Sequence, residues 1–177
     1  TSEVKVWKDL MNAYQTKNKL PDPPSVDQNL WAPSGMENMN AAFKWAINTG
    51  NYKADLWKFY YGTWLAGRGE SEAAIKILSD TKTGVAKVLL ARLLKLKGDM
   101  NGARKAFESI TEPWLQLHPQ VIIERDKVLR NIGIQTIPER EKWLSKVDDL
   151  KDEWIIKRRV KLLMEKEDQT KAKEILF

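Results

Sequence analysis

The 177-residue sequence contains no cysteine and only one histidine. The lack of cysteine excludes disulfides, thiolate nucleophiles and cysteine-ligated metals, but it does not distinguish one cellular compartment from another. His118 has no second histidine with which to share a metal ion, and it stands directly before Pro119, a residue common at helix starts. We therefore expect His118 to have a structural role in a helix-starting turn.

Other chemical signatures are also missing. The sequence has no glycine-rich phosphate loop and no nucleophile elbow, and no apolar run approaches the roughly 20 residues of a membrane-spanning helix. The acidic run Asp148–Glu153 lacks the alternating oxygen ligands and the glycine of a calcium loop, so we interpret it as a turn with acids at a helix start. We expect no catalytic, cofactor-binding or metal site in this chain.

Charge is abundant and unevenly distributed. The net charge is +6, and residues 82–119 hold seven basic against three acidic side chains, whereas residues 1–81 hold nine of each. Residues 120–177 hold fourteen basic and twelve acidic side chains. The excess of positive charge is therefore mostly central, and it favours an acidic partner.

Prolines separate the beginning of the chain from the rest. Helical spacing of apolar residues predicts a first helix over Glu3–Gln15, but Lys17–Gly35 is polar and contains four of the seven prolines, so it cannot be a continuous helix. We divide the chain into an N-terminal helix with a proline-containing linker, 1–36, and a helical array, 37–177. Because the last residues are apolar, where a free-standing array needs a polar cap, we expect the chain to be a piece of a longer protein.

Three stretches of the array share one plan, in which two amphipathic helices flank a short break. The breaks fall at Gly69-Glu70, Gly98-Asp99 and Glu167-Asp168. In each second helix, a small residue is followed four positions later by a large one: Ala74 and Leu78, Ala103 and Phe107, Ala172 and Leu176. The small residues, with Gly62 and Ala91 in the first helices, let paired helices approach closely, and the large ones fill the gap to the next pair.

A weaker pair lies between the second and third copies. It consists of a helix around Pro119–Ile132, a loop over 133–138, and a helix carrying Trp143, Leu144 and Val147. Upstream, Glu37–Thr49 has the pattern of the second helix of a still earlier pair, whose first helix is Glu3–Gln15. The sequence thus predicts about ten helices in five antiparallel pairs.

These features resemble the tetratricopeptide repeat (TPR), from about residue 53 to the chain end. The resemblance rests on Tyr61-Gly62, the breaks after glycine, and the alternating small and large residues. It implies an all-α, right-handed superhelix that binds proteins through its concave face. The region from Glu124 onward is also similar to the repeats of large bacterial proteins in which a β-sandwich resembling sugar mutarotases precedes the repeats.

The segment WKFYYGTWLAGRG, residues 57–69, concentrates aromatic side chains. Trp57, Tyr61 and Trp64 are spaced i, i+4 and i+7 and therefore share a helix face, which indicates packing rather than ligand stacking. Phe59, with Leu56 and Thr63, is expected on the concave side. Trp31, in the linker, is interpreted as a plug that holds the loop.

The same helical register predicts which basic residues face the groove and which lie outside it. Arg92, Lys95, Lys157 and Lys161 are expected in the groove, where with Phe59 they form the predicted partner-binding set. The register of Arg125, Lys127 and Arg130 stays open, whereas Lys97, Arg104 and Lys105 are expected outside.

The function predicted from these residues is a non-catalytic scaffold that binds a protein or peptide, acidic in character, or a neighbouring domain of its own chain. Two alternatives stay open. One is a nucleic-acid-binding repeat, since the sequence Lys157-Arg158-Arg159-Val160-Lys161 is basic. The other is an accessory region of a carbohydrate-active enzyme whose catalytic β domain lies elsewhere.

Overall fold

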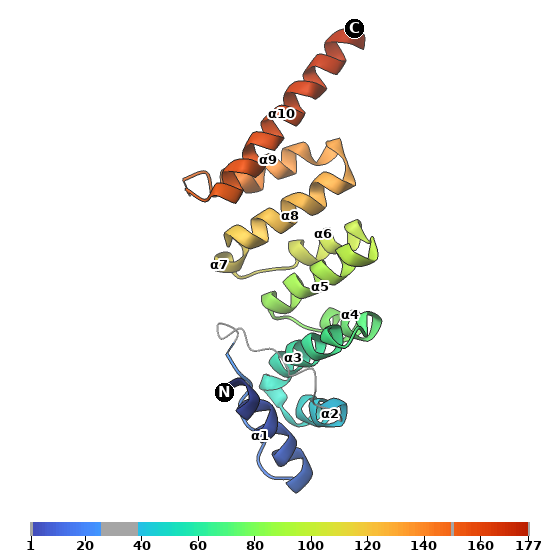
Figure 1. Cartoon of the computed structure of the whole chain (residues 1–177), viewed down its shortest axis with the longest axis vertical. Helices are drawn as coiled ribbons and strands as arrows, with labels where there is room; N and C mark the ends of the chain where they lie inside the picture. The colour runs from blue at the N-terminus through green and yellow to red at the C-terminus, as the bar shows by residue number, and fades with distance from the viewer. Residues whose placement is uncertain (1, 26–38, 150, 177) are drawn as a thin grey trace. The chain divides into compact units, whose positions relative to one another are not determined.

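The computed structural model describes residues 2–25, 39–149 and 151–176, and all regular secondary structure in these ranges is helical (Figure 1). The prediction of an all-α chain is therefore confirmed. The chain forms two compact units, Thr1–Leu93 and Leu94–Phe177, whose boundary falls within one helix. Trp31 lies outside the described residues, and both the predicted division at residue 36 and the predicted superhelical handedness stay predictions.

The first unit contains the helices predicted for it. They are α1 (Ser2–Thr16), α2 (Met39–Thr49), the short 3-10 helix η2 (Asn51–Lys53), α3 (Ala54–Gly67), α4 (Ser71–Ser79) and the beginning of α5 (Gly84–Lys97). The predicted break between α3 and α4 is confirmed, and it contains Gly69 with φ +80°, a left-handed conformation that glycine adopts without strain.

Aromatic rings fill the core of this unit. Phe43 of α2 lies at the centre, with ring centroids 5.5 Å from Tyr61, 5.9 Å from Trp64 and 6.4 Å from Trp57. Trp7 of α1 lies 5.8 Å from Phe43 and is fully buried. The prediction that Trp57, Tyr61 and Trp64 are core residues is confirmed.

Close approach of α3 and α4 depends on Gly62. A Cβ atom at this position would lie 2.6 Å from Cγ and Cδ2 of Leu78, which leaves no room for a side chain. Ala74 and Leu78 are fully buried in the same pair. Their predicted roles, a small residue beneath a large one, are thus confirmed.

The second unit contains the end of α5 and five further α-helices within the described residues. These are α6 (Met100–Glu108), α7 (Pro113–Gln116), α8 (Pro119–Ile132), α9 (Ile137–Ser145) and α10 (Glu153–Leu176), with the 3-10 helix η3 (Ile134–Thr136) before α9. The predicted bounds of α8 agree with the structure. The short α7, with its proline in the first turn, was not predicted.

Side chains cap these helices at the positions where the sequence indicates helix starts. Nδ1 of His118 accepts a hydrogen bond from the backbone N–H of Gln120 at 3.2 Å, so the predicted structural role of this histidine is confirmed. Oδ1 of Asp152 accepts from the N–H groups of Trp154 and Ile155 at 2.8 and 3.1 Å. The acidic run therefore caps a helix, as predicted.

The predicted break at Glu167-Asp168 is wrong. Helix α10 continues through these residues, so the last expected pair is one long helix. The helix contains neither glycine nor proline, and Lys171 forms a 3.2 Å ion pair with Glu167 one turn away. Because an acidic pair does not stop a helix by itself, the analogy with the glycine breaks was misleading.

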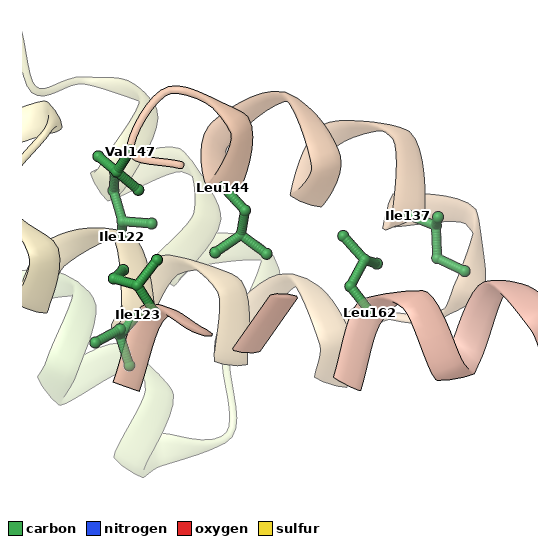
Figure 2. Packing of buried hydrophobic residues seen from close by; sticks show 7 residues of the cluster. Ile122, Ile123, Ile137, Leu144, Val147 and Leu162 are labelled. Atoms are coloured by element: carbon green, nitrogen blue, oxygen red, sulfur yellow. The ribbon is translucent and has the colours of Figure 1, made fainter. Parts of the chain in front are cut away.

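Aliphatic side chains form the apolar core of the second unit. Figure 2 shows Ile122 and Ile123 of α8 with Leu144 and Ile137 of α9 and Leu162 of α10. Val147, in the turn after α9, and Ile155 of α10 complete this buried cluster. The core joins three helices, and it leaves Ile156, Val160, Leu163 and Met164 of α10 exposed.

Candidate binding surface

Three helices of the second unit are joined by buried charges. Asp126 of α8 accepts a hydrogen bond from Nε of Arg140 on α9 at 2.7 Å and another from Nε of Arg158 on α10 at 2.7 Å. All three side chains are more than nine-tenths buried. One carboxylate thus fixes the mutual positions of α8, α9 and α10.

Glu165 extends this network toward the surface. It pairs with Arg140 and, at 2.5 Å, with Nε of Arg130. Burial alone would raise the pKa of Glu165, but hydrogen bonds from Arg140 and Arg130 outweigh it and hold the pKa below its usual value. Burial would lower the pKa of Arg140, but its hydrogen bonds to Asp126 and Glu165 outweigh this effect and raise the pKa.

A second charged cluster involves Arg125, whose register the sequence left open. Its guanidinium carbon lies 3.9 Å from the ring centroid of Trp143, and Nη2 lies 3.7 Å from Glu139. Burial lowers the pKa of Arg125 and outweighs the attraction of Glu139, which would raise it. Arg104 pairs with the same Glu139. Neither arginine is a free surface charge, although Arg104 was expected to be an external residue.

Beside this scaffold, α8 and α10 border a hollow of about 410 Å³. Apolar and basic side chains line it: Ile123, Lys127, Trp154, Ile156, Lys157, Arg158, Val160 and Lys161. Lys127 and Lys161 are exposed, and Lys157 forms a 2.8 Å ion pair with Glu153 while lying 4.6 Å from the Trp154 ring centroid. The hollow therefore presents an apolar surface with lysines at its border.

Arg158 adds a guanidinium to the lining of the hollow. Its Nε donates to Asp126, which also accepts from Arg140, and Arg140 pairs with Glu165 as well. The buried Nη2 of Arg158 has no hydrogen-bond partner in the described part of the chain. The hollow therefore combines apolar surface with basic side chains, a combination that suits an acidic and partly apolar ligand.

The structure groups only part of the predicted binding set. Lys157 and Lys161 border the same hollow, whereas Lys95 lies elsewhere in the second unit and Phe59 and Arg92 lie in the first. Phe59 is half-buried, with its ring centroid 5.1 Å from that of Tyr60, and Arg92 is exposed. Thr63 is buried and donates its hydroxyl to the Phe59 carbonyl oxygen, so it offers little surface to a partner, and its place on the concave side stays a prediction.

Sequence reasoning missed the apolar members of the hollow, Ile123, Trp154, Ile156 and Val160. Trp154 is an exposed aromatic residue in the first turn of a helix, and this position was the one available signal. Ile123 could not be found in this way, because an apolar residue of a helix face is indistinguishable from core until its neighbours are known.

Two further features of the described residues concern metal ions and membranes. Among them, no group of three or more histidine, cysteine, aspartate or glutamate side chains could hold a metal ion. None of the described helices has the length and apolar character needed to cross a membrane.

Paired helices with a small residue packed against a large one, repeated along the chain, define a TPR-like helical-repeat protein. A crystal structure of a TPR-domain containing protein from Parabacteroides distasonis ATCC 8503 is similar to this chain, with a TM-score of 0.89 and 46% sequence identity over 97% of the chain. A family model described as a "-like, C-terminal domain" matches residues 7–177, and the chain belongs to this family of C-terminal domains. The TPR resemblance inferred from the sequence is thereby confirmed.

The matched region is a minor part of the solved protein. This chain covers 30% of the length of that Parabacteroides chain. No curated protein matches the sequence significantly.

Proposed function

We propose that this chain is a non-catalytic helical-repeat scaffold that binds an acidic segment of a protein, supplied by another chain or by another domain of its own. The observation that carries the proposal is the hollow between α8 and α10, where apolar side chains are bordered by Lys127, Lys157 and Lys161. Its walls are held in place by the Asp126 network, so little ordering is needed on binding. Phe59, Arg92 and Lys95, which lie outside the hollow, stay proposed as partner-binding residues in their own right.

The lysines should act mainly on the rate of association. Rim charges steer an oppositely charged partner over a Debye length of about 8 Å at physiological ionic strength, and salt screens this attraction. The apolar lining then provides the contact area that holds the partner. An acidic segment with interspersed apolar residues fits both parts of the hollow.

A binding assay with synthetic peptides tests this proposal. Fluorescein-labelled peptides of glutamate and leucine, and matching peptides of lysine and leucine, are titrated with the chain and followed by fluorescence anisotropy. We expect only the acidic series to bind, and we expect Lys157→Glu with Lys161→Glu to weaken it. Lys105→Glu with Lys173→Glu is the matched control, because both lysines are exposed helix residues away from the hollow. Equal loss in the two double variants would refute the proposal.

Nucleic acid is the weaker candidate. Arg158 of the basic sequence 157–161 points inward to Asp126, so the cluster is not continuous on the surface. An oligonucleotide included in the same titration addresses this alternative, since phosphate contacts produce a steep loss of affinity with salt. The carbohydrate-active alternative rests on the sequence resemblance alone, and its test is a hydrolase assay on the longer protein.

A further inference from the structure

Helix α10 has an apolar strip on the side that faces away from the core. The strip consists of Ile156, Val160, Leu163 and Met164, whose side chains are between 47% and 64% exposed. Their spacing of i, i+4, i+7 and i+8 places them on one side of the helix, whereas Ile155, Arg158 and Leu162 form the opposite, buried side. The strip therefore lies on the exposed side of α10, and two of its residues, Ile156 and Val160, also line the hollow between α8 and α10.

Comparison with other helices shows how unusual this arrangement is within the chain. Helices α3 and α8, which pack on more than one neighbour, bury seven residues each, but only three of the described side chains of α10 are buried. Of the ten large apolar residues that are exposed in the described chain, five belong to α10: Trp154, Ile156, Val160, Leu163 and Met164. Such a concentration marks an interaction surface rather than scattered surface residues.

The charges beside the strip indicate which occupant suits it. From Trp154 to Met164 the sequence has four basic residues and no acidic one. Arg158 is directed to Asp126, so Lys157, Arg159 and Lys161 are the ones that border the exposed side. A second copy of α10 would bring like charges together, which costs binding energy, whereas a partner with acidic flanks would be attracted.

We propose that the strip and the adjoining hollow receive an amphipathic α-helix of the partner, with apolar residues at i, i+4 and i+7 and acidic residues on both sides of them. This inference rests on the proposed function and specifies the partner's conformation. From Ile156 to Met164 the strip extends roughly 12 Å at 1.5 Å per residue, which matches about two turns of a docked helix. The hollow of about 410 Å³ between α8 and α10 gives space for a side chain of the docked helix.

The experiment uses three labelled peptides and the whole chain. The first is a helical peptide with leucines at i, i+4 and i+7 between glutamates, the second has the same composition with prolines that prevent a helix, and the third is the helical peptide with lysines in place of glutamates. We expect the first to bind, and we expect Leu163→Asp or Val160→Asp to weaken it about tenfold, as removal of a central apolar anchor does. Leu96→Asp is the matched control, because Leu96 is 84% exposed on another helix, and it should leave affinity unchanged.

The outcomes separate this inference from the function on which it rests. Equal binding of the proline peptide would overturn the helical partner while leaving an acidic-segment scaffold in place, whereas no binding of either acidic peptide would contradict both. Sedimentation of the chain with vesicles of anionic lipid, lost in Leu163→Asp, would show a membrane surface as the occupant and overturn the proposal. A dimer in analytical ultracentrifugation that Leu163→Asp dissociates would overturn it in favour of a second copy.

Discussion

The helix pairs α3/α4 and α8/α9 differ in the side chains that lie at the contact between their two helices. In the second helices, the fourth residue is Ala74 in α4 and Ala103 in α6, but Arg140 in α9. In the first helices, Ala91 is the eighth residue of α5 and Asp126 the eighth of α8. Where earlier pairs place small residues that allow close contact, α8/α9 places a buried ion pair.

This difference has a thermodynamic consequence. Packing of Gly62 against Leu78 gains dispersion and removes apolar surface from water, and it depends little on pH or salt. A buried ion pair must first compensate the desolvation of both charges, so it fixes geometry more than it adds stability. We therefore expect the two units to respond differently to the same kinds of perturbation.

The largest effect is expected for Asp126→Ala. The change leaves Arg140 and Arg158 buried without their shared carboxylate, and the cost should be about 5 kcal/mol, the upper end for a broken buried pair. Urea denaturation measures the free energy of unfolding, and hydrogen exchange followed by mass spectrometry assigns the loss to the second unit. In the Asp126→Ala background, Arg140→Ala should cost much less than it does alone. Additive effects would show that the pair is not coupled.

Trp64→Ala tests the aromatic core of the first unit. Trp64 is buried beside Phe43 and stacked on Tyr61 at 6.2 Å, so its removal should cost about 4 kcal/mol. Hydrogen exchange should then accelerate in residues 39–79. An unchanged melting temperature would place Trp64 on the surface and restore its interpretation as a ligand platform.

A smaller effect is expected for Gly62→Ala. The new methyl group overlaps Leu78, which costs about 1–3 kcal/mol, but alanine recovers about 1 kcal/mol of helix propensity, so the net loss should be about 1 kcal/mol. Thermal denaturation of the variant and of the double variant with Leu78→Ala measures the coupling. If the Gly62→Ala variant, which retains Leu78, were as stable as the wild type, close approach of the two helices would not explain the glycine at this position.

The smallest effect concerns acid. The pKa of Glu165 is lower in the folded chain than its unfolded value of 4.5, so its contribution to stability is present above pH 4.5 and is lost as pH falls below that value. Urea midpoints measured from pH 6 to pH 3 should therefore decrease more steeply in the wild type than in Glu165→Gln. Parallel curves would show that Glu165 does not take part in the acid response.

Much of the fold could be predicted because its signals are local. The Gly69 and Gly98 breaks, the His118 and Asp152 helix starts, and the buried slots of Ala74 and Phe107 depend on residues within a few positions of one another. The predicted break at Glu167-Asp168 was wrong because these residues carry no local signal that stops a helix. Of the candidate site, Lys157 and Lys161 were predicted and lie at one hollow, whereas Phe59, Arg92 and Lys95 lie outside it and stay predictions.

By itself the sequence determined the helical character of this protein, the plan of its earlier helix pairs and the aromatic core of its first unit, because apolar periodicity and glycine positions act over one or two turns. Only the tertiary structure decided which charged side chains are buried and which are exposed. Arg125 and Arg158 look like surface residues in a basic sequence, yet Trp143 and Asp126 hold them inside. A charged side chain enters the interior only where a partner from a distant segment compensates its desolvation, and that partner becomes known only once the helices are packed.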